Sequence, residues 1–234
     1  MNIEQYAKVA PQYYSDDVPE LLKFLLLFHS FDSYLDCGCG DGSLLHAVTS
    51  AGLLDAKNKN VSAVDLSASR IEIVHNSHPD VYARVDSVES LATVPDNSID
   101  ALASTMVIEH VDDAKMLNSI SRVLNKSGMV YLTTVFKKKY GWYFYKNAEG
   151  KWSIDPTHLR EYTSENELLK HLPVSLQLVY QQKRLHWFPI VDFFIKRLNI
   201  KNRNIFQNPL LRKARKVKVP ILGYYTWELI LKKV

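Results

Sequence analysis

The chain has 234 residues, of which 47% are hydrophobic and 23% charged, and its net charge at pH 7 is +4. This length can bury a substantial core, and the composition is that of an ordinary soluble globular protein. The two cysteines are too few for a disulfide framework, which excludes a cysteine-stapled secreted domain. The first residues lack the features of a signal peptide, and no apolar run could span a bilayer. We therefore expect a cytoplasmic enzyme.

The first predicted element is a helix over residues 18–31, which are rich in leucine. Asp17 and Pro19 are typical of a helix start. Tyr6, Tyr13 and Tyr14 lie upstream, and amphipathic aromatics of this kind are common at such boundaries. The simplest interpretation is that this region packs on the edge of the core.

A glycine-rich turn at residues 38–42 follows a short buried strand at 34–37 and opens a helix predicted over 42–53. Glycine lets a backbone bend tightly and approach a ligand closely. The helix it opens would direct free N–H groups at an anionic group. The dinucleotide-binding fingerprint requires glycine at its sixth position, where this chain has Ser43, so that motif does not fit.

Acidic residues come at the ends of the next predicted strands. The strand at 61–65 ends in Asp65, and the strand at 81–85 is followed by Asp86. Helices predicted over 67–77 and 112–124 alternate with these strands and with strands at 99–104 and 128–135. Such alternation favours a parallel sheet with helices on both faces. Ligands of such sheets bind at the carboxyl ends of the strands.

These landmarks together resemble class I S-adenosylmethionine-dependent methyltransferases, of the type 11 kind that acts on small molecules, glycans or lipids. The resemblance rests on Asp-x-Gly-x-Gly-x-Gly at 36–42, the two later acids, and Glu-His-Val at 109–111. It implies a Rossmann-like α/β fold, doubly wound, with a seven-stranded, mostly parallel sheet and an antiparallel last strand, predicted over 224–232. It also implies S-adenosylmethionine as cofactor and a leader at 1–33 that covers it.

The resemblance implies specific contacts for this cofactor. Asp36 would lie near the methionine amino group, Asp65 would hold the ribose, and Asp86 would lie beside the adenine. The predicted cofactor-binding residues are Asp36, Gly38, Cys39, Gly40, Gly42, Asp65, Leu66, Asp86 and Ser87.

Catalysis would fall to residues near the methyl group. Methyl transfer requires alignment and exclusion of water, and an oxygen acceptor must also lose a proton. His110 and His158 are candidate bases because histidine titrates near neutral pH, although either could be a structural histidine. Glu109 could orient His110, bind the acceptor or contact the cofactor. The sequence around His158 resembles an acceptor-facing segment of small-molecule methyltransferases. The spacing of histidines and acids indicates no metal site.

Two insertions interrupt the predicted fold. An aromatic and basic stretch at 136–163 is interpreted as a lid. After a helix at 164–171 and a strand at 175–184, residues 186–220 form a longer connection than a hairpin needs. Residues 196–218 hold nine Lys and Arg and no acid, so the rest of the chain is net acidic.

This basic arm suggests an anionic partner. It could be a solvated surface, a nucleic-acid contact, or a peripheral membrane contact through residues 187–218, and the order of apolar then basic residues favours the membrane. We therefore expect one methyltransferase domain over 1–234, acting on a hydroxyl of a small molecule, sugar or lipid-linked acceptor. The alternatives are an RNA methyltransferase, which the missing Asn/Asp-Pro-Pro-Tyr/Phe motif disfavours, and a non-catalytic cofactor-binding subunit.

Overall fold

The computed structural model describes residues 17–143, 145–198 and 208–234. Parts of the predicted cover, lid and basic arm therefore lie outside the described residues, namely 1–16, 144 and 199–207.

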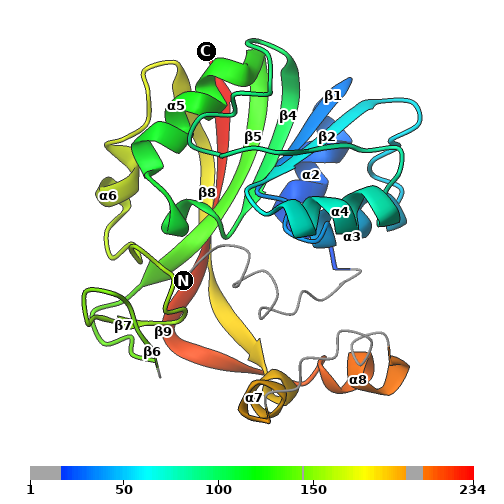
Figure 1. Ribbon diagram of the computed structural model, residues 1–234. Helices are drawn as coiled ribbons and strands as arrows, with labels where there is room; N and C mark the ends of the chain where they lie inside the picture. Colours follow the sequence, from blue (N-terminus) through cyan, green and yellow to red (C-terminus); the bar gives the residue numbers. More distant parts are fainter. Residues whose placement is uncertain (1–16, 144, 199–207) are drawn as a thin grey trace.

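Seven strands form one sheet in the order β3-β2-β1-β4-β5-β9-β8 (Figure 1). Their bounds are β1 Ser33–Cys37, β2 Asn60–Asp65, β3 Tyr82–Val85, β4 Ile99–Thr105, β5 Leu124–Lys137, β8 Leu176–Pro189 and β9 Lys218–Lys233. Neighbours from β3 to β5 are parallel, whereas β9 is antiparallel to both β5 and β8. This topology confirms the predicted doubly wound, Rossmann-like sheet with its antiparallel last strand.

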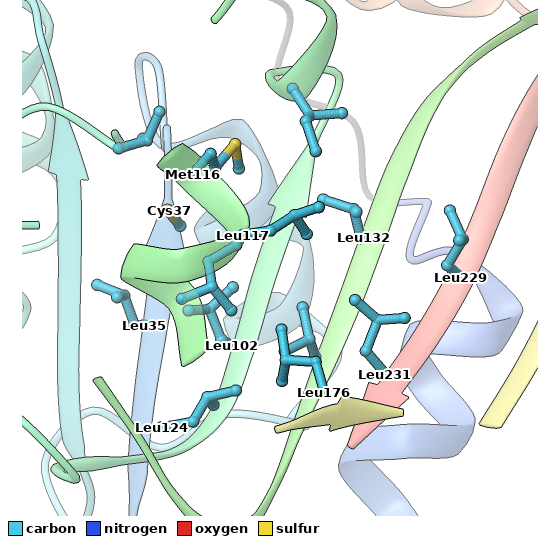
Figure 2. Packing of buried hydrophobic residues seen from close by; sticks show 14 of the residues in the cluster. Leu35, Cys37, Leu102, Met116, Leu117, Leu124, Leu132, Leu176, Leu229 and Leu231 are labelled. Carbon is cyan, nitrogen blue, oxygen red and sulfur yellow. The ribbon is translucent and has the colours of Figure 1, made fainter. Parts of the chain in front are cut away.

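Helices cover both faces of the sheet, as predicted. They are α2 Glu20–Phe28, α3 Ser43–Ser50, α4 Ala68–Ser77, α5 Asp113–Val123 and α6 Glu165–Leu169, with a 3₁₀ turn, η1, at Ile108–His110. Two more helices, α7 Ile190–Arg197 and α8 Pro209–Ala214, come between β8 and β9 in the chain and lie apart from the body of the sheet (Figure 1). On one face Leu22, Leu45 and Ile71 join α2, α3 and α4 in one core cluster. On the other face α5 places Met116 and Leu117 over the sheet (Figure 2).

The start of β5 differs from the prediction. The strand was predicted to begin at residue 128, but Leu124 already pairs with Ile99. The register then shifts, and Ala101 pairs with Met129. Ser127 has a φ of +67°, a left-handed conformation that accommodates the extra residues as a bulge. The turn-like composition therefore marks an irregularity inside the strand.

Strands β8 and β9 run further than predicted. Their pairing continues from Leu176↔Lys233 to Pro189↔Lys218, so residues 186–189 and 218–223 form a ribbon inside the predicted insertion. This ribbon leaves the body of the sheet and ends at α7 and α8 (Figure 1). A ribbon of two strands has no deeply buried face along this stretch, so its sequence lacks the alternation that identifies a strand.

The predicted lid contains a short hairpin, β6 Tyr145–Lys146 and β7 Trp152–Ser153. The segment that leads into it packs on the ribbon: the N–H of Lys138 donates to the carbonyl of Gly223 at 2.8 Å. The segment that leaves it returns to the sheet, where Tyr162 bridges Phe136. This return brings residues 155–161 over the carboxyl end of β4.

Candidate functional site

The glycine loop between β1 and α3 is held on two sides. The N–H groups of Gly38 and Cys39 both donate to the carbonyl of Val64, at 2.8 and 2.9 Å. On the other side, a Cβ at Gly38 would lie 2.5 Å from a methyl group of Val107, and the φ of Gly38 is +80°. Only glycine tolerates both this positive φ and the close approach of Val107. The loop thus lies directly against the segment that leads from β4 into η1.

Asp65, at the carboxyl end of β2, fixes this loop. Its two carboxylate oxygens accept hydrogen bonds from the N–H of Gly40 and the N–H of Ser67, both at 2.9 Å. A carboxylate oxygen has two lone pairs, so each can accept one further hydrogen bond. The predicted contact with two ribose hydroxyls is compatible with this geometry.

Asp36 is buried at the end of β1, and its Oδ2 has no hydrogen-bond partner among the described residues. Burial, and then the charge of Asp65, raise the pKa of Asp36 to about 7. A buried carboxylate without a partner is costly, and a cation beside it would remove that cost. Asp36 therefore fits a site for the amino group of a ligand in the glycine loop.

Asp86 is already fully engaged. Its carboxylate accepts four hydrogen bonds, from the N–H groups of Ser87, Ala92 and Thr93 and the hydroxyl of Thr93, at 2.7–3.2 Å. Partial burial acts to raise the pKa of Asp86, but these bonds outweigh it and lower the pKa. The carboxylate holds the loop that follows β3, and all its acceptor positions are in use. Its adenine contact stays a prediction.

The remaining predicted cofactor-binding residues differ in their exposure and in the groups that they offer to a ligand. Leu66 is 53% exposed at the end of β2, where its side chain can cover a flat ring. Ser87 is partly buried beside Asp86. The side chain of Cys39 is buried in the core cluster that includes residues of α2 and α3, and its thiol donates to the carbonyl of Gly40 at 3.5 Å. Gly40 and Gly42 have φ of +56° and +83°, and Gly42 begins α3.

Glu109 lies in η1 and is fully buried. Its Oε2 accepts from the hydroxyl of Thr134 at 3.0 Å, and its Oε1 has no partner among the residues described. Burial raises the pKa of Glu109 to about 7, although the charge of His158 acts in the opposite direction. The carboxylate of Glu109 thus faces other buried groups of the protein and not solvent.

The fold brings His158 against His110, with ring centroids 4.7 Å apart. Nδ1 of His158 lies 3.0 Å from Oε1 of Glu161, and Nδ1 of His110 lies 3.1 Å from the hydroxyl of Thr157. All three predicted catalytic residues therefore meet at one place.

The pKa values of the two histidines shift in opposite directions. Burial acts to lower the pKa of His158, but the bond to Glu161 and the charges of Glu109 and Asp155 outweigh it, and the pKa is raised. Burial, and then the charge of His158, lower the pKa of His110 to about 4. Near neutral pH His110 is therefore an uncharged imidazole.

Several residues of this site were not anticipated from the sequence. Glu161, Thr157 and Thr134 hold the predicted catalytic residues but carry no motif of their own. The only local signal was the spacing of three between His158 and Glu161. The prediction of no metal site rested on the spacing of residues along the chain. The fold brings Glu109, His110 and His158 together, where each offers one ligand atom and these atoms lie within 4.8 Å of one another.

A cavity of about 1010 Å³ opens beside the glycine loop, between α2, α3 and the strands β8 and β9. Its wall includes Ser43 at the start of α3, Thr105 at the end of β4, Thr133 within β5, and His186 on β8. Burial, and then the charge of His158, lower the pKa of His186 to about 4. The cavity is large enough for an organic acceptor.

Comparisons with known proteins agree with this geometry. Residues 35–132 match the family model of the methyltransferase domain. A ubiquinone biosynthesis O-methyltransferase of Xanthomonas oryzae pv. oryzae is 31% identical over 106 residues, which cover 43% of this chain and 42% of that protein. The chain thus spans about two fifths of the length of this curated relative.

Solved structures share the fold over nearly the whole chain. An S-adenosylmethionine-dependent methyltransferase structure from Methanosarcina mazei has a TM-score of 0.60 at 15% identity, covering 93% of this chain and 99% of that one. The [4+2]-cyclase SpnF has a TM-score of 0.63 at 17% identity, covering 99% and 95%. At these identities the likeness concerns the fold.

Proposed function

We propose that this chain, which belongs to the class I S-adenosylmethionine-dependent methyltransferases, transfers a methyl group to a hydroxyl of a small or lipid-linked molecule. The observation that carries the proposal is the contact between two parts of the site. The glycine loop, fixed by Asp65, touches Val107, which leads directly into Glu109 and His110. A group bound in the loop would lie beside an uncharged imidazole.

The residues of the loop have distinct roles in this proposal. When bound, S-adenosylmethionine supplies a methyl group that its sulfonium centre already activates. The unpartnered Oδ2 of Asp36 pairs with its amino group, and Asp65 accepts from the ribose hydroxyls. Leu66 covers the base and excludes water. His110 and His158 lie where an acceptor hydroxyl must lose its proton.

The acceptor class rests on two observations. The cavity beside the loop has hydroxyl and imidazole groups on its wall, which suit a polar ring that carries a hydroxyl. In addition, the curated relative is named as an O-methyltransferase of ubiquinone biosynthesis. We therefore expect oxygen as the acceptor atom and a phenol with a prenyl chain as a suitable first substrate.

A transfer assay with methyl-labelled S-adenosylmethionine tests this function. The acceptors are a prenylated phenol, a polyprenyl-linked saccharide and an RNA oligonucleotide. We expect label in the phenol or the saccharide, and loss of transfer in Asp65→Ala. Label in RNA alone would support an RNA methyltransferase. Cofactor binding without transfer to any acceptor would favour a non-catalytic subunit, or another reaction on this fold, such as the one named for SpnF.

We also propose that the far end of the ribbon contacts an anionic membrane surface. Among the residues that the structure describes, no helix has the length and apolar character to cross a bilayer. An apolar groove of about 420 Å³ lies between the lid and the ribbon, and Trp142, Phe188 and Ile221 line it.

Exposed side chains around the groove support the same contact. Leu210 is 75% exposed and Leu222 73% exposed, and Lys213, Lys216 and Lys218 are exposed nearby in the chain. Apolar groups flanked by lysine are typical of surfaces that bind anionic lipid head groups. Figure 1 shows this end of the ribbon projecting away from the body of the sheet.

Vesicle sedimentation tests the membrane contact. We expect the chain to bind vesicles of phosphatidylglycerol, to bind phosphatidylcholine weakly, and to release at high salt. Leu222→Glu should weaken binding at least about tenfold. Val174→Glu is the matched control, because Val174 is fully exposed in the turn before β8 and lies outside this surface. Equal binding by both variants would contradict the proposal.

A further inference from the structure

The cluster of Glu109, His110 and His158 joins two segments that are far apart in sequence. Glu109 and His110 form the end of η1, after β4, whereas His158 follows the lid hairpin. Main-chain hydrogen bonds fix the two segments together, since the carbonyl of Glu109 accepts from the N–H of Leu159 at 2.9 Å. One ligand atom from each of the three side chains lies within 4.8 Å of the other two.

Each member of the cluster is held through its other polar atom. Nδ1 of His158 lies 3.0 Å from the carboxylate of Glu161, and Nδ1 of His110 lies 3.1 Å from the hydroxyl of Thr157. Oε2 of Glu109 accepts from Thr134. These contacts leave Nε2 of each ring and Oε1 of Glu109 for one another. Histidines that bind metals are usually held in this way, through the second ring nitrogen.

The second observation is the unpartnered oxygen. Glu109 is fully buried, and its Oε1 has no hydrogen-bond partner among the described residues. Leaving a buried acceptor unsatisfied costs free energy, and a bound cation would compensate for it. Thr134 satisfies only the other oxygen of the same carboxylate.

We propose that Glu109, His110 and His158 bind one divalent transition-metal ion, with positions left open for the acceptor oxygen. Two imidazole nitrogens and one carboxylate oxygen suit Zn²⁺, Mn²⁺, Fe²⁺ or Co²⁺. Three protein ligands with an open position are the arrangement of catalytic metal sites. His110 is only partly buried, so the ion and the acceptor can reach the cluster from its side.

The role of the ion rests on the proposed methyltransferase function. A metal ion lowers the pKa of an oxygen that it binds, so the acceptor hydroxyl loses its proton to water. A lone pair of that oxygen then forms the bond to the methyl carbon, while the bond from this carbon to sulfur breaks and its electrons stay on sulfur. The products are a methyl ether, S-adenosylhomocysteine and one proton. The two histidines then act as ligands of the ion instead of as bases.

The competing explanation is a buried ion pair between Glu109 and a protonated His158, without metal. It accounts for those two residues but gives His110 no role. The chain also offers an internal control, the pair His46 and His78, whose rings lie 6.3 Å apart. His46 lies near the start of α3 and His78 directly follows α4, and neither belongs to the cluster.

Metal binding is measured on the full chain after chelator treatment, without cofactor or acceptor. Zn²⁺ and Mn²⁺ are titrated by calorimetry, and Co²⁺ is followed by its visible absorption, which reports the ligand set. We expect one ion per chain. Glu109→Gln and His110→Asn should each weaken binding at least about 100-fold, and Glu161→Gln about 10-fold to 100-fold. His78→Asn should leave binding unchanged.

Several outcomes would overturn the proposal. One is no binding to the wild type, and another is binding that His78→Asn removes and His110→Asn preserves, which indicates an adventitious ion only. His110→Asn is informative even if Glu109→Gln does not fold, because His110 is only partly buried. Metal binding without methyl transfer would leave this site standing and count against the proposed function instead.

Discussion

The two halves of the sheet are built differently. Strands β3, β2, β1 and β4 have four to seven residues each, and Asp65 at the end of β2 binds the glycine loop. Strands β5, β9 and β8 have 14 to 16 residues, and β8 and β9 run past the body of the sheet into the ribbon. The family model matches residues 35–132, which include β2, β3, β4 and most of β1 and end within β5.

The difference in strand length corresponds to a difference in role between the two halves of the sheet. The first half has a backbone shape and an acid pattern that serve one ligand. In the second half, the long strands connect to the lid and line part of the cavity and of the apolar groove. The lid and the groove lie outside the residues that the family model matches. The comparison predicts that changes in the second half affect stability or the acceptor, whereas changes in the glycine loop and its acids affect the cofactor.

The largest expected effect is on stability, from Trp227→Ala in β9. Trp227 is fully buried, its ring lies 5.8 Å from that of Phe136 and 6.0 Å from that of Tyr162, and its Nε1 donates to Gln181. We expect the free energy of unfolding to fall by about 3–5 kcal/mol. Urea denaturation measures it, with the partly exposed Trp152→Ala as control. Equal losses in both variants would show that this core does not stabilise the second half.

The next effect concerns the glycine loop. In Gly38→Ala the new Cβ meets Val107 at 2.5 Å in a backbone with φ of +80°. We expect a loss of about 2–4 kcal/mol and weaker cofactor binding. Gly52→Ala is the matched control: its φ is +69°, and the described structure leaves the space around its Cβ open. Its loss should be about 1 kcal/mol.

A double variant identifies the cause of that loss. Val107→Ala in the Gly38→Ala background should recover part of the stability, because the overlapping methyl groups are gone. If Gly38→Ala costs no more than Gly52→Ala, the contact with Val107 does not constrain the loop.

The third effect is a pH dependence that comes from Asp36. Its pKa is raised to about 7 by burial and the charge of Asp65, so the carboxyl group is mostly protonated below that pH. If it pairs with the amino group of the cofactor, affinity should fall about tenfold for each pH unit below 7. Calorimetry across pH 5–8 measures the slope, which Asp36→Asn should remove. An equal slope in both proteins would contradict this role.

The same group affects the stability of the free protein in a defined direction. Between the ordinary pKa of 3.8 and about 7, the folded state binds more protons at Asp36 than the unfolded state does. The contribution of Asp36 to the free energy of unfolding therefore falls as pH rises through this window. Thermal unfolding of the wild type should show a steeper decline there than that of Asp36→Asn.

The smallest expected effect is that of Thr93→Val. It removes the 2.7 Å hydroxyl bond to Asp86 and leaves the three bonds from N–H groups. We expect a loss of about 1 kcal/mol in stability and an unchanged cofactor affinity. A tenfold loss of affinity would indicate that Asp86 serves the adenine directly.

The cofactor half could be predicted because its signals are local. Three glycines and an acid stand within seven residues at 36–42, and Asp65 ends a short apolar strand. The parallel arrangement of those strands then brings their ends together. The positions of the acidic residues in the sequence could not show that the carboxylate of Asp86 accepts hydrogen bonds from the loop that follows it.

The second half depends on contacts between distant segments. His110 and His158 were each identified as candidates, but their meeting depends on how the chain returns from the lid to β5. The proposed metal ligands had no recognisable spacing in the sequence for the same reason. The ribbon was missed because its strands have no alternating pattern of apolar and polar residues.

Calorimetric titration of S-adenosylmethionine and S-adenosylhomocysteine into the wild type and Asp65→Ala tests the central claim most directly. Asp65 accepts from both Gly40 and Ser67, so its loss removes the clamp on the loop together with the ribose contact. We expect micromolar binding, about −8 kcal/mol, that falls at least about 100-fold in Asp65→Ala and is unchanged in the exposed control Asp80→Ala. No binding by the wild type, or equal binding by Asp65→Ala, would contradict the account.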